Sequence, residues 1–351
     1  MKAPFIYFGG KGPVTNLVWE ALGDVDNYVE PFAGSLAVLL NRPGERDGRI
    51  ETVNDVDHFL TNFWRALASD PISVAEHADW PVNEDDLFAR HMWLVSKGRG
   101  ILESGISSDP DFFDTKIAGW WVWGINAWIG GGWCSGRGPW HVCEGGVAKF
   151  SECKCKEESG DLEVEGVTRS VPYLKGSGQG VNRKLPSPES PRYIPDTLHH
   201  PTIGPLLLYF EELAERMRKV RVCTGDWERV VTRGALSGGA TVGVFLDPPY
   251  SGDVREQDLY AAEDYSVSKQ VREWAVEHGD DPRMRIVMAG YSEEHDDDFP
   301  DSWRRIRWSA SASYQTSASA KTEGGNSENR HKEVLWLSPA CEDKCQGELW
   351  G

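Results

Sequence analysis

The chain has 351 residues, of which 40% are hydrophobic and 11% aromatic, so it can bury a large core and is expected to be globular rather than disordered. It contains no apolar run of about 18 residues and no apolar N-terminal signal segment, which disfavours a membrane protein and a secreted one. The formal net charge of −18 is unfavourable for contacts with phosphate groups, and seven unevenly spaced cysteines fit a reducing cytoplasm better than a disulfide framework.

The first sixty residues alternate between helix and strand signals. Pro13 and Gly23 stand where a helix would begin and end. A short apolar strand follows, and Asn54-Asp55 closes a second strand in which polar and apolar residues alternate. The predicted elements are, in order, a helix over 14–22, a strand at 28–29, a turn over 30–35, a helix over 36–40 and a strand over 49–53. This order, with an acid at the end of the second strand, is the plan of a nucleotide-binding βαβ unit.

Two glycine-containing segments in this region predict close contact with a ligand. Gly34 lies in the turn after the first strand, and Asp55 follows about 20 residues later, the spacing at which an acid reaches the hydroxyls of a ribose. No further glycine completes a G-x-G-x-x-G pattern, so a pyrophosphate site is not indicated. Ahead of the first helix, Gly9 and Gly10 allow tight backbone approach, and Lys11 could meet a ligand carboxylate.

The middle of the chain, over 61–234, breaks this alternation. Helical patterns at 58–67 and 206–220 flank a stretch over 130–195 that is rich in Gly, Ser, Pro and charged residues. Because this stretch is too long for an ordinary connection within a compact domain, we interpret it as a separate module or a set of long loops, inserted between two halves of one sheet. Residues 175–234 hold 10 Lys and Arg against 7 Asp and Glu, so a DNA-binding face could lie there despite the acidic total.

Six of the sixteen tryptophans gather between residues 120 and 140. Trp121 and Trp128 share one face of a predicted helix, which indicates a buried aromatic core. The glycine-rich segment that follows combines a cation with aromatic rings, as a loop that probes a DNA groove or flips a base would need; these residues are Trp133, Arg137 and Trp140.

Two further features of the middle segment leave alternatives open. Arg183 and Lys184 lie among Pro, Ser and Gly residues, where they could contact phosphates or line a solvated loop. Four cysteines between residues 134 and 155 could bind zinc, but the paired C-x2-C spacing is missing. Thiols without a metal are therefore the favoured interpretation, and no metal is expected.

A second α/β stretch follows at the end of the chain. The predicted elements are a strand over 240–246, a helix over 266–278, a strand over 285–289, and two strands near 303–310 and 333–337 that could close the sheet as a hairpin. Between the last two, a stretch rich in Ser, Ala, Gly and Asn predicts a loop.

The strand over 240–246 ends at the sequence Asp247-Pro248-Pro249-Tyr250. Adenine N6 is a poor nucleophile because its lone pair is delocalised into the ring, and acceptors for its two protons favour attack by that nitrogen. The carboxylate of Asp247 and the backbone carbonyl of Pro248 would be such acceptors, since two prolines remove two N–H donors. Tyr250 would offer a flat face to the base. The plain alternative is a strand end with a proline turn and a capping Asp.

Together these motifs resemble the Dam-like DNA N6-adenine methyltransferases, a family with many phage members. In that family an aromatic-x-G-G-K segment precedes a [DE]-P-F-x-G motif, an N-D or A-D pair ends the next strand, and D-P-P-Y follows after the target-recognition region. The matching segments here are Tyr7–Lys11, Glu30–Gly34, Asn54-Asp55 and Asp247–Tyr250. The resemblance is good near both ends of the chain and poor between roughly 140 and 200.

The resemblance implies an α/β fold, namely a Rossmann-like S-adenosylmethionine-dependent methyltransferase sheet with an inserted, mainly helical and loop target-recognition module. The implied domains are a cofactor-binding half over 1–60, a DNA-binding insertion over 61–234 and a catalytic half over 235–351. The implied reaction is direct in-line methyl transfer to N6 of an adenine flipped out of double-stranded DNA, without a metal or a covalent enzyme intermediate.

The resemblance also assigns roles to individual residues. Those expected to contact S-adenosylmethionine or to shape its pocket are Tyr7, Gly9, Gly10, Lys11, Glu30, Pro31, Phe32, Gly34, Asp55 and Asp247. The expected catalytic residues are Asp247, Pro248, Pro249 and Tyr250. The expected DNA contacts are Trp133, Arg137, Trp140, Arg183 and Lys184.

Other functions stay open at this point. The same acceptors would serve N6 methylation of RNA or N4 methylation of cytosine, although the G-G-K segment and the motif order favour adenine in DNA. A catalytically inactive DNA-binding relative is disfavoured by the intact Asp247–Tyr250 motif. The expected location is the cytoplasm of a bacterium or phage-infected cell, and the sequence indicates neither the recognition site nor a companion restriction endonuclease.

Overall fold

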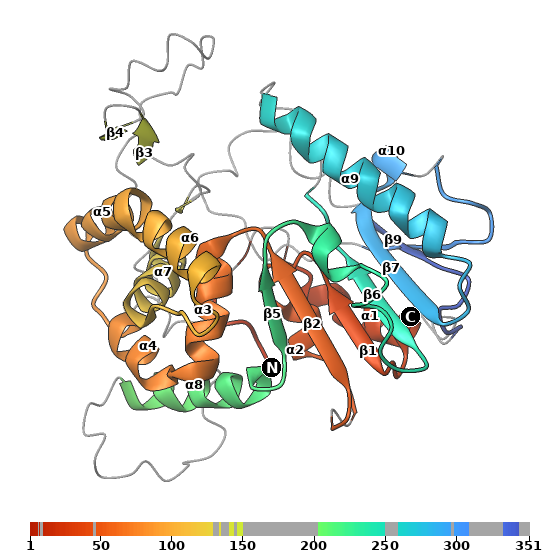
Figure 1. Cartoon of the computed structure of the whole chain (residues 1–351), viewed down its shortest axis with the longest axis horizontal. Coiled ribbons are helices and arrows are strands. Elements are labelled where there is room, and N and C mark those ends of the chain that lie inside the picture. The colour runs from red at the N-terminus through yellow and green to blue at the C-terminus, as the bar shows by residue number, and fades with distance from the viewer. Residues whose placement is uncertain are drawn as a thin grey trace. The chain divides into compact units, whose positions relative to one another are not determined.

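The computed structural model describes residues 1–5, 7, 10–44, 47–128, 133–134, 140–143, 146–149, 203–249, 259–295, 298–308 and 333–343. The chain divides into two compact units, which are described separately (Figure 1). We call residues 1–10 and 56–224 the helical unit, and residues 11–55 and 225–351 the sheet unit.

The sheet unit contributes six strands of a seven-stranded sheet, in the order β2-β1-β6-β7-β9-β8. The strands are β1 (Asn27–Glu30), β2 (Ile50–Asp55), β6 (Val242–Leu246), β7 (Met284–Tyr291), β8 (Arg304–Arg307) and β9 (Glu333–Leu337). Strand β1 pairs in parallel with both β2 and β6, and β6 pairs in parallel with β7. Strand β9 is antiparallel to its two neighbours, β7 and β8.

Helices cover the parallel strands of the sheet unit. They are α1 (Thr15–Leu22), after the 3-10 turn η1 (Gly12–Val14), α2 (Ala37–Leu40), the 3-10 turn η6 (Trp227–Val230), α9 (Leu259–His278) and α10 (Ser292–His295). Figure 1 shows α9 on one face of the sheet and α1 on the other. Every residue of β1 and β6 is buried, as expected for strands covered on both faces. On α1, the Trp19 ring packs against Tyr28 of β1, with ring centroids 4.8 Å apart.

The order of connection reverses between β1 and β6. From β1 the chain continues to β2 on one side, and from β6 it continues to β7 on the other. This is the arrangement of a doubly wound, Rossmann-like sheet, so the predicted fold class is confirmed. In such sheets ligands bind beyond the carboxyl ends of the strands at the point of reversal.

The helical unit is built around α7 (Thr115–Ala127). Its other helices are α3 (His58–Ser69), α4 (Pro71–Ala78), α5 (Glu84–Trp93), the π-helical turn η2 (Leu94–Gly98), α6 (Arg99–Ser108) and α8 (Ile203–Met217). Its strands are β3 (Trp140–Cys143) and β4 (Gly146–Lys149), which form an antiparallel pair, and β5 (Arg221–Thr224). Several helices begin at a side chain that accepts a hydrogen bond from the backbone of the first turn, which explains where they start; these caps are Asp57, Asp70, Asn83 and Asp114.

Aromatic rings fill the core of the helical unit. Trp121 of α7 is 1% exposed and lies against Phe5, with ring centroids 5.0 Å apart. Phe63 and Trp64 of α3 pack edge to face beside it. The aromatic core that the tryptophan spacing predicts is therefore present. Within the described ranges, the helices are all too short or too polar to cross a membrane.

Candidate active site

Three acidic residues lie at the carboxyl ends of neighbouring strands in the sheet unit. Glu30 is the last residue of β1, Asp55 is the last residue of β2, and Asp247 directly follows β6. Strands β2, β1 and β6 are consecutive in the sheet, so these acids share the edge at which the connection order reverses. This is where a doubly wound sheet binds its ligand.

A buried ion pair holds one of these acids. Lys11 Nζ lies 2.8 Å from Asp247 Oδ1, and the two side chains are 5% and 20% exposed. Lys11 stands at the start of the η1 turn that leads into α1. A lysine buried to this degree needs a partner for its charge, and the pairing fixes the position of the Asp247 carboxylate.

The turn after β1 is fastened to the end of β2 by hydrogen bonds. Gly34 N donates to Asp55 Oδ2 over 3.0 Å, and Ala33 N donates to the backbone oxygen of Asn54 over 2.8 Å. Asn54 Nδ2 in turn donates to the backbone oxygen of Pro31 over 3.1 Å. Gly34 has a φ of +46°, in the left-handed region that favours glycine. The predicted pair of Gly34 and Asp55 is thus joined directly.

Glu30 and Phe32 are held by neighbours on the sheet unit. Glu30 is 2% exposed, and its Oε2 accepts a hydrogen bond from the hydroxyl of Tyr28 over 2.9 Å. Burial, followed by the nearby Glu30, raises the pKa of Tyr28 well above its ordinary value, so this hydroxyl stays a donor. The Phe32 ring stacks on Trp227 at 6.2 Å between centroids. Both side chains therefore shape the turn.

Glu333, which the sequence analysis did not single out, also belongs to this edge. It begins β9 and pairs with Tyr291 of β7. Burial raises the pKa of Glu333, while Lys11 lowers it and Asp247 raises it, so both charges lie close enough to act on this carboxyl. Its strand was predicted, but nothing in the sequence indicated that antiparallel pairing would bring its first residue within electrostatic range of Lys11 and Asp247.

The remaining predicted residues are placed as follows. Pro248 is buried and Pro249 is exposed, and neither carries an N–H donor. Tyr7 and Gly10 belong to the helical unit, where Gly10 N donates to the Tyr7 oxygen over 3.1 Å and closes a turn just before Lys11. Trp140 begins β3. Five predicted residues lie outside the described part of the chain: Gly9, Arg137, Arg183, Lys184 and Tyr250.

Trp133 is buried within the helical unit. It is 8% exposed, its ring stacks on His91 with centroids 4.9 Å apart, and its Nε1 donates to the backbone oxygen of Trp121 over 3.1 Å. In this structure its side chain takes part in core packing. The contact between Trp133 and DNA that the sequence analysis expects stays a prediction.

The cysteines that the structure describes include two buried thiols. Burial raises the pKa of Cys134 well above its ordinary value and that of Cys341 to about 11, and such thiols are poor nucleophiles and metal ligands. Within the described residues, no group of three or more His, Cys, Asp and Glu side chains is arranged to hold a metal ion. Cys153 and Cys155 lie outside those residues.

The edge of the sheet therefore offers hydrogen-bond acceptors to a ligand. Asp55 accepts a bond from Gly34 through one oxygen, and a carboxylate can accept several bonds at once. An acid at the end of β2, beside a glycine turn that follows β1, fits the ribose and base of a nucleoside. Asp247 and the backbone oxygen of Pro248 add acceptors at the end of β6, where an amine could be bound.

The amino-acid sequence was compared with models of known protein families, and one family matches. The model of the D12 class N6 adenine-specific DNA methyltransferases matches residues 7–97. The matched segment contains Lys11, the turn after β1 and Asp55, and it ends before Asp247. It confirms the resemblance to adenine methyltransferases that act on DNA. No curated protein matches the chain.

Proposed function

We propose that this protein transfers a methyl group from S-adenosylmethionine to N6 of an adenine in DNA, at a specific site. The observation that carries this proposal is the Lys11–Asp247 ion pair at the point where the sheet's connection order reverses. It joins the family-matched N-terminal segment to an aspartate followed by two prolines, which is the acceptor arrangement that an exocyclic amine needs.

The residues around the glycine turn are proposed to hold the cofactor. S-adenosylmethionine supplies a methyl group activated by its positively charged sulfur. Asp55 would accept hydrogen bonds from the ribose hydroxyls, while Glu30, Pro31, Phe32 and Gly34 shape the pocket. Asp55 is already oriented by Gly34, so little side-chain entropy is lost when it binds. The resemblance also implies that Tyr7, Gly9 and Gly10, which precede Lys11 in the same motif, contact the cofactor.

The catalytic step is proposed to depend on Asp247. Its carboxylate would accept one N6 hydrogen bond and the backbone oxygen of Pro248 would accept the other, which frees the nitrogen lone pair for attack. The new bond joins N6 to the methyl carbon as the bond between that carbon and sulfur breaks, and N6 loses one proton, for which Asp247 is the acceptor. Lys11 positions the carboxylate throughout.

The target adenine must leave the base stack before it can reach Asp247. Unstacking costs a few kcal/mol, and stacking of the base on Tyr250 would recover about 1–3 kcal/mol. Contacts between DNA and Arg137, Trp140, Arg183 and Lys184 are proposed to hold the duplex, in keeping with the locally basic composition of residues 175–234.

Methyl transfer tests this proposal directly. The full chain is incubated with methyl-labelled S-adenosylmethionine and duplex DNA, and the DNA is digested to nucleosides and separated. We expect label in N6-methyladenine, and we expect Asp247→Ala to abolish transfer while cofactor binding remains measurable. Asp280→Ala, which removes an exposed acid elsewhere in the sheet unit, serves as the matched control.

Three results would contradict parts of the proposal. Label in N4-methylcytosine, or transfer to RNA in preference to DNA, would assign the chain to a different amine substrate. Asp247→Ala activity within tenfold of the wild type would remove Asp247 from the catalytic role. Absence of transfer to any nucleic acid, with DNA binding intact, would favour a DNA-binding relative without catalysis.

A further inference from the structure

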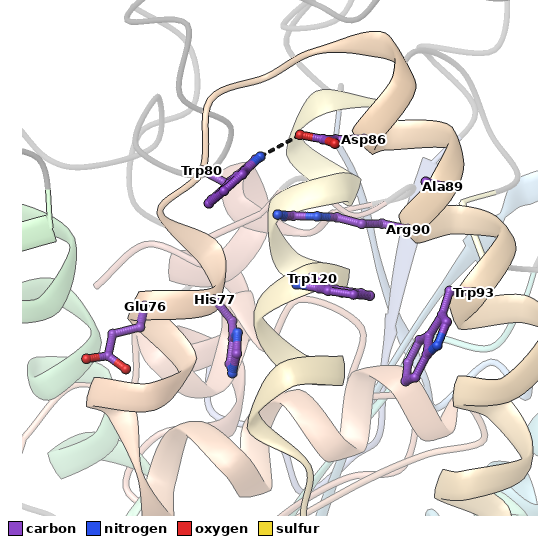
Figure 2. Close-up of a pocket in the computed structure, with 8 residues that line it drawn as sticks. All are labelled: Glu76, His77, Trp80, Asp86, Ala89, Arg90, Trp93 and Trp120. Carbon is purple, nitrogen blue, oxygen red and sulfur yellow. Dashed lines mark hydrogen bonds between the residues drawn. The ribbon is translucent and has the colours of Figure 1, made fainter.

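A hollow of about 530 Å³ opens in the helical unit between α4, α5 and α7, a size typical of small-molecule sites (Figure 2). Three indole rings line it, those of Trp80, Trp93 and Trp120. Trp80 is 45% exposed, so the aromatic surface is accessible to a ligand. All of these residues lie within the helical unit, and none belongs to the proposed active site.

The most unusual residue of this pocket is Arg90. Its guanidinium carbon lies 5.1 Å from the ring centroids of both Trp80 and Trp120, and 4.3 Å from that of Trp123. Figure 2 shows its side chain crossing the hollow between Trp80 and Trp120. Arg90 is only 9% exposed, yet among the described residues Nη1 has no hydrogen-bond acceptor. Burial lowers the pKa of Arg90 to about 10, so it remains a cation at neutral pH.

A buried donor without an acceptor is uncommon in proteins, because leaving it unpaired costs about 1–3 kcal/mol. The guanidinium of Arg90 lies over three indole faces, which offset part of this cost, and its position at the wall of the hollow points to a ligand that brings an acceptor there. The flat indole walls favour a ligand with a planar ring.

The charges around the pocket restrict the ligand further. Aromatic cages often bind cations, but here Arg90 and Lys116 already lie over the rings, the latter 4.3 Å from the centroid of Trp93. A second cation would be repelled. Asp86 and Glu76 line the same hollow, and hydrogen bonds from Asn83 and Trp80 lower the pKa of Asp86, which disfavours an anionic group inside the hollow. The group that fits inside is planar and neutral, with acceptors on one edge and donors elsewhere, and any phosphate attached to it would have to lie outside the hollow.

We propose that this pocket binds an unpaired nucleobase, with guanine preferred. Guanine presents two adjacent acceptors, O6 and N7, to an arginine, and it carries N–H donors that a carboxylate such as Asp86 can accept. Its ring would lie against the exposed indole of Trp80, as bases do in single-strand-binding proteins. The inference goes beyond the proposed methyl transfer and does not require it. The base could belong to a free nucleotide or to an unpaired position in nucleic acid.

Calorimetric titration of the full chain with dGMP, and with dAMP, dCMP and dTMP for comparison, tests the proposal. Two variants remove the site in different ways. Ala89→Leu fills the hollow from an exposed helical position that lines it, and Arg90→Gln removes the cation. Ser104→Leu places the same leucine on an exposed position of α6 and is the matched control. Circular dichroism verifies that each variant is folded.

We expect dGMP to bind more tightly than the other three nucleotides. Arg90→Gln should weaken its binding about ten- to hundredfold, the effect of losing one hydrogen bond to a charged group. Ala89→Leu should weaken it by a similar factor because the leucine occupies space that the ring needs, and Ser104→Leu should not. If Arg90→Gln fails to fold, Ala89→Leu alone decides the result. Binding that is unchanged by Ala89→Leu, or equal affinity for all four nucleotides, would overturn the proposal.

A second titration identifies the source of the base. A DNA duplex with one looped-out guanine is compared with the fully paired duplex and with dGMP. Tighter, Ala89-dependent binding of the looped duplex assigns the site to nucleic acid, whereas binding of dGMP alone assigns it to a free nucleotide. Absence of binding to both overturns the proposal. Neither titration uses the methyl donor, so a failed methylation assay with intact dGMP binding counts against the proposed function alone.

Discussion

At the scale of single residues, Lys11 and Asp247 illustrate how much of the site depends on long-range pairing. Each residue could be chosen from a local sequence pattern, a glycine pair before a lysine and an aspartate before two prolines. The charge of Lys11 suggested contact with a ligand carboxylate and the resemblance implied contact with S-adenosylmethionine, and both roles stay predictions. The structure adds the 2.8 Å ion pair with Asp247, which no local pattern indicates because the two residues stand near opposite ends of the chain.

A double-mutant cycle measures this coupling without relying on activity. Lys11→Met leaves the partly buried carboxylate of Asp247 without this cation, and Asp247→Asn leaves the buried ammonium of Lys11 without this anion. Either change should lower the free energy of unfolding of the sheet unit, and the double variant should lose less than the sum. We expect a coupling of about 1–3 kcal/mol, measured by denaturant unfolding. Additive effects would show that the pair contributes nothing beyond its separate side chains.

Asp55 offers a test of the cofactor site alone. Asp55→Asn keeps the size of the side chain but removes the charge that would bind the ribose hydroxyls. We expect the Kd for S-adenosylmethionine to rise about ten- to hundredfold by calorimetry. Asp26→Asn is the matched control, because Asp26 accepts backbone hydrogen bonds from Ala240 and Thr241 at the opposite end of β1. Unchanged affinity in Asp55→Asn would place the cofactor elsewhere.

At the scale of helices and strands, the sequence predicts whether an element is a helix or a strand better than it predicts where the element begins and ends. Strands β1, β6 and β7 were each expected within a few residues of their observed ends, because buried parallel strands read as short apolar runs bounded by turn residues. Strand β2 was expected from its alternation of polar and apolar residues, and the antiparallel strand β9 was expected over its observed range. Helix α9 is longer than expected and begins at Leu259 rather than near 266. Its first seven residues, Leu259 to Tyr265, mix apolar side chains with two acids and were not predicted as helix.

The start of α2 shows why some local structure escapes prediction. A helix was expected from Leu36, but α2 begins at Ala37, and Leu36 has a φ of +56°. A branched side chain in this left-handed region is unfavourable by itself. Leu36 is fully buried, so tertiary packing holds the conformation that its own preference opposes. Sequence patterns carry no signal for such a position.

Helix α7 gives a prediction at this scale. Asp114 caps the helix by accepting a hydrogen bond from Ile117 N over 2.8 Å, and its backbone exchanges two bonds with the Asn62 side chain. Asp114→Ala should lower the free energy of unfolding of the helical unit by about 1 kcal/mol. Asp111→Ala, an exposed acid in the preceding loop, should change it by less than about 0.5 kcal/mol. Equal losses in both variants would exclude a specific capping role.

At the scale of the whole molecule, each unit contains a buried histidine that affects its response to acid. Burial lowers the pKa of His91 in the helical unit from 6.5 to about 4. Burial, then the nearby Arg272, lowers the pKa of His295 in the sheet unit from 6.5 to about 4. Both rings are neutral when folded, and His91 Nε2 accepts a hydrogen bond from Cys134 N.

The lowered pKa values of His91 and His295 determine how the free energy of unfolding changes with pH. Below about pH 6.5 the unfolded chain takes up a proton that the folded histidine refuses, so the stabilisation is complete above this pH and is lost as the pH falls toward 4. At pH 5 the loss is about 2 kcal/mol for each histidine. Denaturant unfolding at pH 7.5 and 5.0 should show this drop, and His295→Asn should reduce the drop in the sheet unit by about 2 kcal/mol. An identical drop in the variant would assign acid sensitivity to other groups.

The strand order of the sheet unit has a consequence for how the chain is made. Strand β1 hydrogen-bonds to β6, and Asn27 stands opposite Val242. A ribosome adding about 5–20 residues per second synthesises the intervening segment in roughly 10–40 s, and the helical unit emerges almost entirely within that interval. Strand β9 is made after β8 yet lies between β7 and β8. We therefore expect the helical unit to fold first during translation, while β1 waits with an unpaired edge that a chaperone would need to protect.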